Sequence, residues 1–419
     1  MADFELSMAS CLGGVGVSSV GVAISGGGDS TALLLLLVDW SRVRDVKIRA
    51  VTVDHGLRAA AKTEALQVAR LCANLGVSHD ILTWSGWNGR GNLQGNARNA
   101  RYDLIRDWAG AHKIDVVALG HTKDDQAETV LMRLLRGSGV DGLAGMANRR
   151  EDGNLSWCRP LLGASRAELR NFLRAKNIDW SEDPSNDDLK FDRVKIRSLL
   201  ARALEMGLTS QGLADTAARM NSARHALQTQ TLEIARNICT VTPVGDIEIQ
   251  AEQFFALDDE FKLRLMGHSL KWVASEIYQP RRKMLISLVK TISERRKATL
   301  SGCFITHRAQ NLIRISREPK AVAALTTAPD QIWDGRWAFV GDNTGGQYHI
   351  ASLGEDGLDE VKSLSKTGPD DLPRDSALAL PAIWQGERLR ASPLTGWPQG
   401  WKCHLQKGAE HYFTSFLSH

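Results

Sequence analysis

Six residues near the N-terminus have the types and spacing of a phosphate-binding turn: Ser25, Gly26, Gly27, Gly28, Asp29 and Ser30. The apolar residues 21–24 precede the turn and the apolar residues 31–38 follow it, which predicts a strand, the turn and a helix. Glycines let the backbone approach a ligand, and the first N–H groups of a helix have no partner inside it. Since the helix dipole is positive at this end, the turn predicts a site for phosphate. No Gly-Lys-Ser/Thr follows, so this turn is not a Walker A loop.

A second polar pair, Asp54 and His55, follows the apolar residues 48–53. A nucleotide that lies across strand ends needs polar groups near its base and ribose, and this pair is placed for that role. The alternative is an ordinary turn with a solvated aspartate. The nearby phosphate turn favours the nucleotide.

Residues 120–129 combine His121 with three carboxylates, those of Asp124, Asp125 and Glu128. Spacings of three and four residues put such side chains on one face of a helix. An acidic cluster beside a phosphate site indicates a Mg²⁺ ion or a cationic substrate. Carboxylates in a first turn also cap helices, and a histidine here could be structural, so those alternatives stay open.

Basic residues recur near these motifs. Arg98 and Arg101 lie three apart and share a helix face, Arg136 begins a glycine-rich segment, and a turn containing Asn186 precedes Arg193 and Arg197. Arginine binds phosphate with two parallel hydrogen bonds, so these residues are candidates for phosphate contacts. The alternative is a solvated basic surface and a flexible connector.

The elements that must position these residues alternate between strand and helix. Strands are predicted at 21–24, 48–53, 80–83 and 116–119, and helices at 31–38, 62–75, 96–112 and 124–136. This alternation predicts an α/β fold, a Rossmann-like doubly wound parallel sheet. Ligands of open α/β sheets bind beyond the carboxyl ends of the strands, so the polar residues that follow the strands should meet at one edge.

The pattern changes after about residue 200. A long helix is predicted at 208–238, helices with basic clusters at 281–283 and 295–297, and a hairpin at 299–316. We therefore expect three domains: a nucleotide-binding catalytic domain at 1–207, a mainly helical domain at 208–320 and a small, β-rich domain at 331–419.

Composition narrows the class of protein. The 419 residues carry a formal net charge of +4, which permits a nucleic-acid partner without requiring one. The longest apolar run, residues 33–38, is far shorter than the roughly 20 residues of a membrane span. The N-terminus lacks a basic region, so we expect neither a secretory signal nor a membrane partner. Six scattered cysteines without a Cys-x-x-Cys pair fit a reducing cytoplasm.

Ser-Gly-Gly-x-Asp-Ser at 25–30 resembles the pyrophosphate loop of the ATP pyrophosphatase (PP-loop) superfamily, whose members cleave ATP to AMP and pyrophosphate. Further segments narrow the resemblance to tRNA(Ile)-lysidine synthetases: Val-Asp-His-Gly-Leu-Arg at 53–58, His-x-x-Asp-Asp-Gln-x-Glu-Thr at 121–129, Arg-Gly-Ser-Gly at 136–139 and Asp-Pro-Ser-Asn at 183–186. The resemblance is strong over residues 20–200, moderate to about 303 and weak beyond 330.

The resemblance implies a two-step reaction. ATP adenylates the C2 carbonyl oxygen of the wobble cytidine in a tRNA(Ile) with a CAU anticodon, and the ε-amine of free L-lysine then attacks C2 and displaces AMP to give lysidine. Decoding changes from AUG to AUA. ATP and Mg²⁺ are the implied co-substrate and metal.

The resemblance also suggests roles for individual residues. We expect Asp29, Asp125, Glu128 and Arg193 to be catalytic, with Asp125 and Glu128 binding lysine. Mg²⁺ is expected at Asp29 and Asp124. The 25–30 turn with Asp54 and His55 is expected to bind ATP and pyrophosphate. Contacts to tRNA or adenylate are expected from Arg98, Arg101, His121, Arg136, Asn186 and Arg197. The helical domain would bind the tRNA backbone.

Other readings remain. A tRNA thiolase of the same superfamily could use Cys158, although paired cysteines are absent. A small-molecule AMP-forming ligase would not need the basic helices, and a non-catalytic RNA-binding protein would not need the acidic cluster. The oligomeric state is open, with a homodimer as one option. The role of 331–419 and the discrimination against tRNA(Met), which shares the anticodon, are also open.

Overall fold

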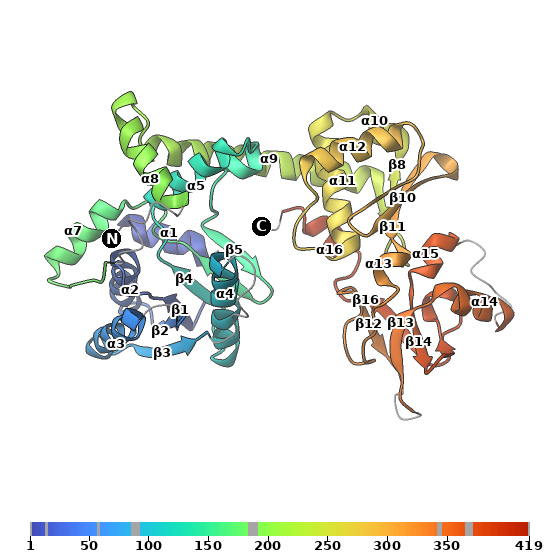
Figure 1. The fold of residues 1–419 in the computed structure, drawn as a ribbon, viewed down its shortest axis with the longest axis horizontal. Coiled ribbons are helices and arrows are strands. Elements are labelled where there is room, and N and C mark those ends of the chain that lie inside the picture. The colour runs from blue at the N-terminus through green and yellow to red at the C-terminus, as the bar shows by residue number, and fades with distance from the viewer. Residues whose placement is uncertain are drawn as a thin grey trace. The chain divides into compact units, whose positions relative to one another are not determined.

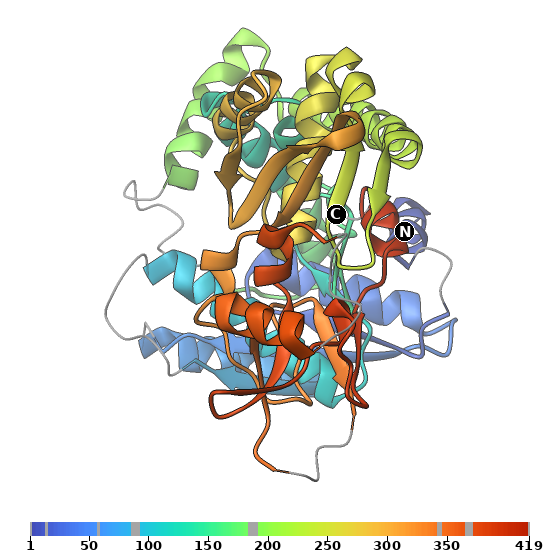
Figure 2. The same ribbon diagram turned by 90° about the vertical axis from the view of Figure 1, so that its right-hand side faces the viewer.

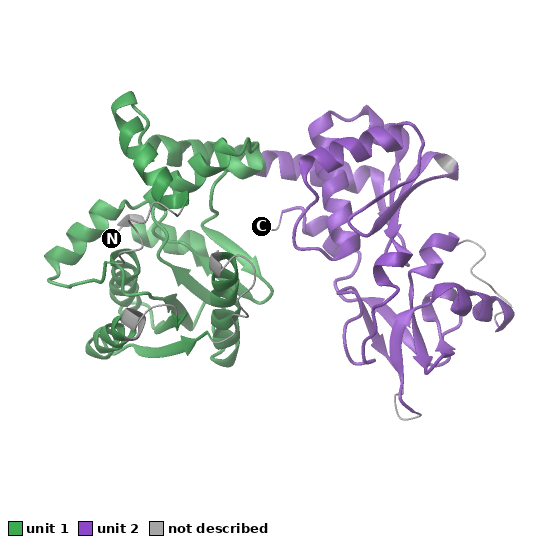
Figure 3. Ribbon diagram, viewed as in Figure 1, with its two compact units in different colours: residues 1–224, 419 green, residues 225–418 purple. Residues whose placement is uncertain are grey.

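The computed structural model describes residues 2–12, 16–56, 59–84, 93–182, 192–341, 346–364 and 372–417. The chain divides into two compact units, residues 1–224 and 225–418 (Figure 3). Each unit has its own sheets and its own buried apolar clusters.

The first unit is built on a six-stranded sheet in the order β3-β2-β1-β4-β6-β5 (Figure 1). Its strands are β1 (Ser19–Ala23), β2 (Lys47–Asp54), β3 (Ser78–Thr83), β4 (Val116–Leu119), β5 (Arg149–Asp152) and β6 (Leu155–Cys158). All neighbouring strands pair in parallel except β5, which is antiparallel to β6. The chain leaves β1 toward β2 and returns to its other side at β4, so the order reverses beside β1 and the expected doubly wound sheet is confirmed.

Helices connect and cover these strands: α1 (Ala2–Leu12), α2 (Gly28–Ser41), α3 (Ala59–Asn74), α4 (Leu93–Ala111), α5 (Lys123–Leu135), α6 (Val140–Leu143), α7 (Arg166–Ala175) and α8 (Asp192–Ala203). The leucine run of α2 is buried from Leu33 to Leu37, which explains why this helix is apolar all round. The four predicted strands and four predicted helices are present, with ends shifted by a few residues.

Sequence reasoning missed the β5–β6 hairpin and α7. The four residues of β5 are Arg-Arg-Glu-Asp, a polar sequence that is typical of a loop. The four buried residues of β6 are too few to show a periodicity.

The second unit begins within the long helix α9 (Ser210–Ile238). A five-stranded antiparallel sheet, ordered β7-β8-β11-β10-β9, packs against two helices, α11 (Asp259–Ala274) and α12 (Arg282–Ser293) (Figure 2). The strands are β7 (Cys239–Val241), β8 (Ile247–Gln250), β9 (Ala298–Leu300), β10 (Cys303–Arg308) and β11 (Leu312–Arg317), and α10 (Ala251–Ala256) follows β8.

Small antiparallel sheets occupy the C-terminal part, as its expected β-rich character requires. One pairs β12 (Trp337–Val340) with β16 (Lys402–Leu405), and the other joins β13 (His349–Ser352), β14 (Pro381–Gln385) and β15 (Arg388–Ala391). The remaining helices are α13 (Pro319–Val322), α14 (Gly354–Leu364), α15 (Arg374–Leu378) and α16 (Glu410–Thr414). Tyr412 of α16 returns to the core around α11, where its hydroxyl lies 2.8 Å from that of Ser269. The division of the chain into three domains, at 1–207, 208–320 and 331–419, stays a prediction.

Among the described residues, no helix combines the length and the apolar character needed to cross a bilayer.

A close backbone contact fixes the phosphate turn against the sheet. A Cβ atom at Gly120, directly after β4, would lie 3.0 Å from Cα of Ser30 and 3.1 Å from its backbone nitrogen. Backbone atoms cannot move aside as a flexible side chain can, so this position requires glycine.

We expect Gly120→Ala to lower the free energy of unfolding by about 1–3 kcal/mol, because the added methyl group overpacks the contact with Ser30. Denaturant unfolding followed by circular dichroism measures the change. Gly110→Ala in α4 is the control: nothing lies within 4 Å of its Cβ, so it should be neutral or stabilising. Equal stability of the two variants would contradict the close contact.

Candidate functional site

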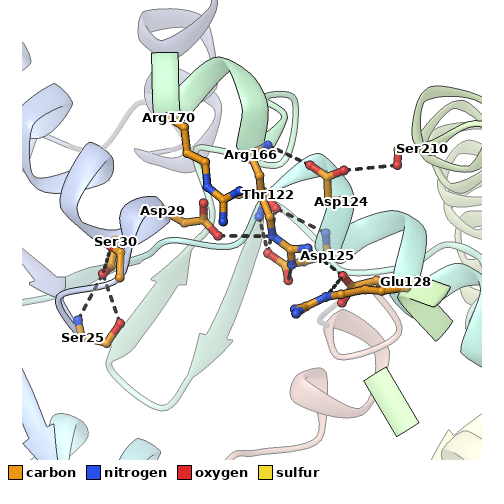
Figure 4. A network of polar contacts seen from close by, with 12 residues as sticks. Ser25, Asp29, Ser30, Thr122, Asp124, Asp125, Glu128, Arg166, Arg170 and Ser210 are labelled. Carbon is orange, nitrogen blue, oxygen red and sulfur yellow. Dashed lines mark hydrogen bonds and ion pairs between the residues drawn. The ribbon is translucent and has the colours of Figure 1, made fainter. Parts of the chain in front are cut away.

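Local hydrogen bonds fix the conformation of the turn between β1 and α2, where we predict an anion site. Gly27 is the N-cap of α2 and carries no side chain, so the N–H groups of the first helical turn are not capped. The Oγ of Ser30 accepts a hydrogen bond from the N–H of Ser25 at 3.2 Å and donates to the carbonyl of Gly27 at 3.0 Å (Figure 4). Gly26 has φ +87°, a left-handed conformation that favours glycine. The predicted cradle for phosphate is therefore formed by local hydrogen bonds.

The chain after α7 closes one side of this turn. The N–H of Ser181 donates to the carbonyl of Gly26 at 2.9 Å. A Cβ at Gly28 would lie 3.3 Å from the ring of Trp180. The glycines at 26 and 28 are therefore required by conformation and by close approach respectively.

Arg166, the first residue of α7, contacts three of the candidate carboxylates, those of Asp29, Asp125 and Glu128 (Figure 4). Its guanidinium lies 2.5 Å from Oδ1 of Asp125, 2.8 Å from Oε1 of Glu128 and 3.4 Å from Oδ2 of Asp29. The structure thus brings together Asp29 from the phosphate turn and the two acids that the sequence placed on one helix face.

Asp125 also caps its helix. Its Oδ2 accepts hydrogen bonds from the N–H and the hydroxyl of Thr122, both at 2.8 Å, and Thr122 caps α5 in return. The capping alternative and the ion-pair role therefore both hold for Asp125, one for each oxygen. Since the cap fixes the carboxylate, Oδ1 is held toward Arg166.

Glu128 is the most deeply buried acid of the group, with 1% of its surface exposed. Its Oε1 accepts from Arg166 and from Arg197 of α8, the latter at 2.6 Å, whereas its Oε2 is buried without a hydrogen-bond partner. Arg166 and Arg197 contact these carboxylates, and Arg170 also lies near Asp29 (Figure 4). The buried Oε2 of Glu128, an acceptor without a partner, is suited to bind a cation.

The environment shifts the pKa of these acids in opposite directions. Burial raises the pKa of Asp29, although Arg166 opposes the shift. Burial would also raise the pKa of Asp125, but Arg166 and the hydrogen bonds from Thr122 outweigh it and lower this pKa. Asp125 is therefore the more firmly ionised of the two.

His121 lies just after β4, near groups of opposite charge. Burial, followed by Arg159, lowers its pKa to about 3, with further contributions from Arg101 and Arg193, while Asp125 opposes them. The imidazole is therefore neutral at physiological pH. Its Nδ1 is buried without a hydrogen-bond partner.

Two further predicted groups lie near these arginines. The pKa of His55 is lowered by burial and then by Arg101, while Oδ1 of Asp54 accepts the N–H of Gly56 at 2.8 Å. Arg98, on the same helix as Arg101, has its guanidinium 5.3 Å from the ring centre of Tyr102. The strand-end residues and the basic face of α4 therefore adjoin one another.

Arg136 lies apart from this network, whereas Asp124 adjoins it through the backbone of Arg166. Arg136 and Asp192 are both well exposed, and their charged atoms lie 3.6 Å apart, so Arg136 forms a surface ion pair. Asn186 lies outside the described residues. Asp124 accepts the N–H of Arg166 at 2.8 Å and the hydroxyl of Ser210 at 3.2 Å, so both its oxygens hold neighbouring helices.

The acids fit a magnesium ion only in part. Within the described residues, no three His, Cys, Asp or Glu side chains form a group that could hold a metal. Mg²⁺ bound to a nucleotide needs only one or two carboxylates, because phosphate and water oxygens complete its shell. Asp29, on the phosphate turn, fits such a role better than Asp124, whose oxygens are occupied.

Sequence reasoning missed Arg166 and Arg159. Arg159 directly follows β6, so the rule about polar residues after strands would have identified it had β6 been predicted. Arg166 had no such signal, since its acidic partners lie 38 and 41 residues away in α5.

Comparison with known proteins decides the family. Residues 2–204 match the model of the PP-loop domain. The tRNA(Ile)-lysidine synthase of Ruegeria pomeroyi is 44% identical over 400 residues, which cover 96% of this chain and 94% of the relative. The chain belongs to the tRNA(Ile)-lysidine synthase family. The enzyme of Mesorhizobium japonicum is 35% identical over 90% of this chain and 84% of its own, and that of Wolbachia pipientis 37% over 77% and 76%.

Among solved structures, the U34-tRNA thiolase NcsA from Methanococcus maripaludis is similar at 17% identity and a TM-score of 0.45, over 53% of this chain and 78% of its own. Family membership confirms the resemblance drawn from the motifs at 25–30, 53–58 and 121–129. It also confirms an enzyme that binds ATP.

The half-buried His121 of this lysidine synthase family member predicts a pH dependence of stability. The pKa of His121 is about 3 in the folded chain and about 6.5 in the unfolded chain, so the unfolded chain binds more protons between these values. Stability is therefore complete above pH 6.5 and falls as the pH decreases.

His121 should contribute a loss of about 2 kcal/mol between pH 7.5 and pH 5. His121→Gln should remove that part of the loss, measured by denaturant unfolding at both pH values. The exposed His404→Gln should keep it. The same pH dependence in both variants would show that His121 is not held neutral.

Proposed function

We propose that this chain joins the ε-amine of free L-lysine to C2 of the wobble cytidine in a tRNA(Ile) with a CAU anticodon, with Asp125 and Glu128 binding the lysine. ATP supplies the energy, and lysidine, AMP and pyrophosphate are the products. The single observation that carries this assignment is the cation-binding acid pair beside the phosphate turn in a chain of this family.

In the first step, the C2 carbonyl oxygen of the cytidine attacks the α-phosphorus of ATP. A bond forms between this oxygen and the α-phosphorus. The bond between the α-phosphorus and the oxygen that bridges to the β-phosphate breaks, and pyrophosphate leaves. The uncapped N–H groups at the start of α2, with Ser25 and Ser30, would hold the departing pyrophosphate. Mg²⁺, held at Asp29, would neutralise phosphate charge when bound.

In the second step, the ε-nitrogen of lysine attacks C2 and AMP leaves with the C2 oxygen. Free lysine has a pKa of about 10.4, so only about one amine in a thousand is neutral at pH 7. A buried carboxylate must therefore hold the ammonium and accept a proton. The partnerless Oε2 of Glu128 is suited to accept the proton, while Asp125, with its lowered pKa, supplies a fixed charge for the ammonium.

Arg166 contacts the acid oxygens to which the lysine ammonium would bind. We infer that the ammonium replaces the guanidinium at these oxygens. One cation exchanges for another, so the buried carboxylates are never left without a counter-ion. A neutral amino acid side chain could not make this exchange, which favours lysine.

The second unit offers basic surface for the tRNA backbone. Both predicted clusters, residues 281–283 and 295–297, are exposed at the two ends of α12. Arg282 pairs with Glu260 and Arg296 with Glu294, while Arg281 and Lys283 are exposed cations at the N-terminal end of α12. Such residues support binding of phosphates and a salt-sensitive affinity.

A tRNA thiolase is the weaker reading, because the cysteines are unsuited to carry sulfur. Cys158 is fully buried, and its pKa is raised by a hydrogen bond with Cys11 and by burial. A nucleophilic or sulfur-carrying cysteine needs exposure and a lowered pKa.

The reaction is tested by incorporation of radiolabelled lysine into a tRNA(Ile) transcript with a CAU anticodon, with ATP and Mg²⁺. We expect label in this transcript and none in elongator tRNA(Met). Asp125→Asn and Glu128→Gln should lower kcat/KM for lysine roughly 100-fold, because each removes a buried charge partner of the ammonium. Asp103→Asn, which alters an exposed acid of α4, is the matched control. ATP cleavage to AMP without lysine incorporation would reject the assignment.

The exchange at Arg166 makes a separate prediction. Arg166→Gln should lower stability by about 3 kcal/mol, because it leaves buried carboxylates unpaired, and should lower KM for lysine by removing a competing cation. Added lysine should then raise the unfolding temperature more in this variant than in the wild type. Arg174→Gln, on the same helix, should behave as the wild type. A raised KM for lysine would instead mean that Arg166 only positions the two acids.

A further inference from the structure

The first unit also contains a group of four arginines that share part of one carboxylate, that of Asp152. Arg98 and Arg101 come from α4, Arg150 from β5, and Arg159 directly follows β6. They surround the side chain of Tyr102, and we call these four arginines with Tyr102 the arginine cluster. The resemblance to the family implied no role for Arg150 or Arg159.

Contacts to Tyr102 define the cluster. The guanidinium carbons of Arg98 and Arg150 lie 5.3 Å and 5.2 Å from the ring centre, and Arg98 donates to the hydroxyl at 3.4 Å. The edge of Trp157, with ring centres 4.7 Å apart, fixes the other side of the ring. Burial would raise the pKa of Tyr102, but the four arginines together lower it, as a strongly positive local potential requires.

Arg159 is the costliest member, because only 6% of it is exposed. One of its nitrogens donates to the carbonyl of Ala147 at 2.8 Å, and its Nε is buried without a partner. Within the described residues it pairs with no carboxylate, and the same holds for Arg98 and Arg101. A buried cation without a counter-charge destabilises the fold, so packing alone does not account for it.

The one nearby acid is already occupied. Asp152 lies 3.5 Å from Arg150 but only 2.7 Å from Arg106, and it also accepts from the ring nitrogen of Trp157 at 3.1 Å. The Nε of Arg150 is likewise buried without a partner. Four cations therefore share a fraction of one carboxylate.

The sheet topology places this cluster at the edge where β4 and β6 end. Strand β6 runs parallel to β4, so Arg159 leaves the sheet at the same edge as His121. Arg101 and Arg159 both lie close enough to His121 to lower its pKa. The cluster thus lies near His121, at the edge where β4 and β6 end.

We propose that the arginine cluster is a phosphate-binding site, in which Arg159 and Arg150 extend the basic face of α4. This inference rests on the proposed function, because it deepens the site of that reaction. A single carboxylate would neutralise one of four cations, whereas phosphate oxygens accept several guanidinium hydrogen bonds at once. Two sources of phosphate are available to this enzyme, the RNA backbone beside the target cytidine and the phosphates of ATP.

The test uses the full chain with Arg159→Gln, Arg150→Gln and the control Arg42→Gln, an exposed arginine paired with Asp39. Binding of the tRNA(Ile) transcript is measured from 50 to 200 mM salt, and KM for ATP is measured in the lysine incorporation assay. If the phosphate belongs to RNA, each cluster variant should weaken tRNA binding about 10- to 100-fold and reduce the salt slope by about 1. If it belongs to ATP, KM for ATP rises instead and tRNA affinity is unchanged. The control should change neither.

Unchanged affinity for both ligands in both cluster variants would overturn the proposal. Arg150 is partly exposed, so its variant decides the matter if Arg159→Gln fails to fold. Loss of an unpaired buried cation should not lower the unfolding temperature, which separates this role from a structural one. Wild-type protein that binds tRNA with the expected differences but incorporates no lysine would reject the proposed function and leave the phosphate site intact.

Discussion

The arrangement of the first unit depends on the guanidinium of Arg166. It holds carboxylates from the turn after β1 and from two successive turns of α5, while its N–H binds Asp124. Without a cation there, three buried or half-buried acids would repel one another. The phosphate turn and the acid pair are thus held together by one side chain.

The residues that could be predicted from the sequence share a local signal. Ser25, Asp54 and His121 each follow an apolar strand, and Asp125 and Glu128 repeat at helical spacing, so their common location followed from topology. Arg166 and Arg159 could not be found in this way. The first joins partners far away in the chain, and the second follows a strand of four residues. Long-range electrostatic pairing leaves no periodic trace in a sequence, whereas burial and helix geometry do.

The structure also explains why the sequence allowed two interpretations of Asp125. Its sequence position is that of a helix cap, and its Oδ2 performs that role with Thr122. Its Oδ1 forms the ion pair with Arg166. A capping residue is rigid because its own helix holds it, so the fold obtains a preorganised charge from a residue that it needs for helix stability.

Groups of opposite charge act on neutral His121. Burial and then Arg159, Arg101 and Arg193 lower its pKa, and Asp125 opposes them. If the imidazole were charged, it would compete with an ammonium for Asp125 and add a fifth cation to the arginine cluster. Burial prevents this by keeping its pKa near 3. The reaction joins a cationic amine to a nucleotide flanked by phosphates, so the enzyme must attract both charges without letting its own groups neutralise each other. A neutral His121 adds no charge to either group.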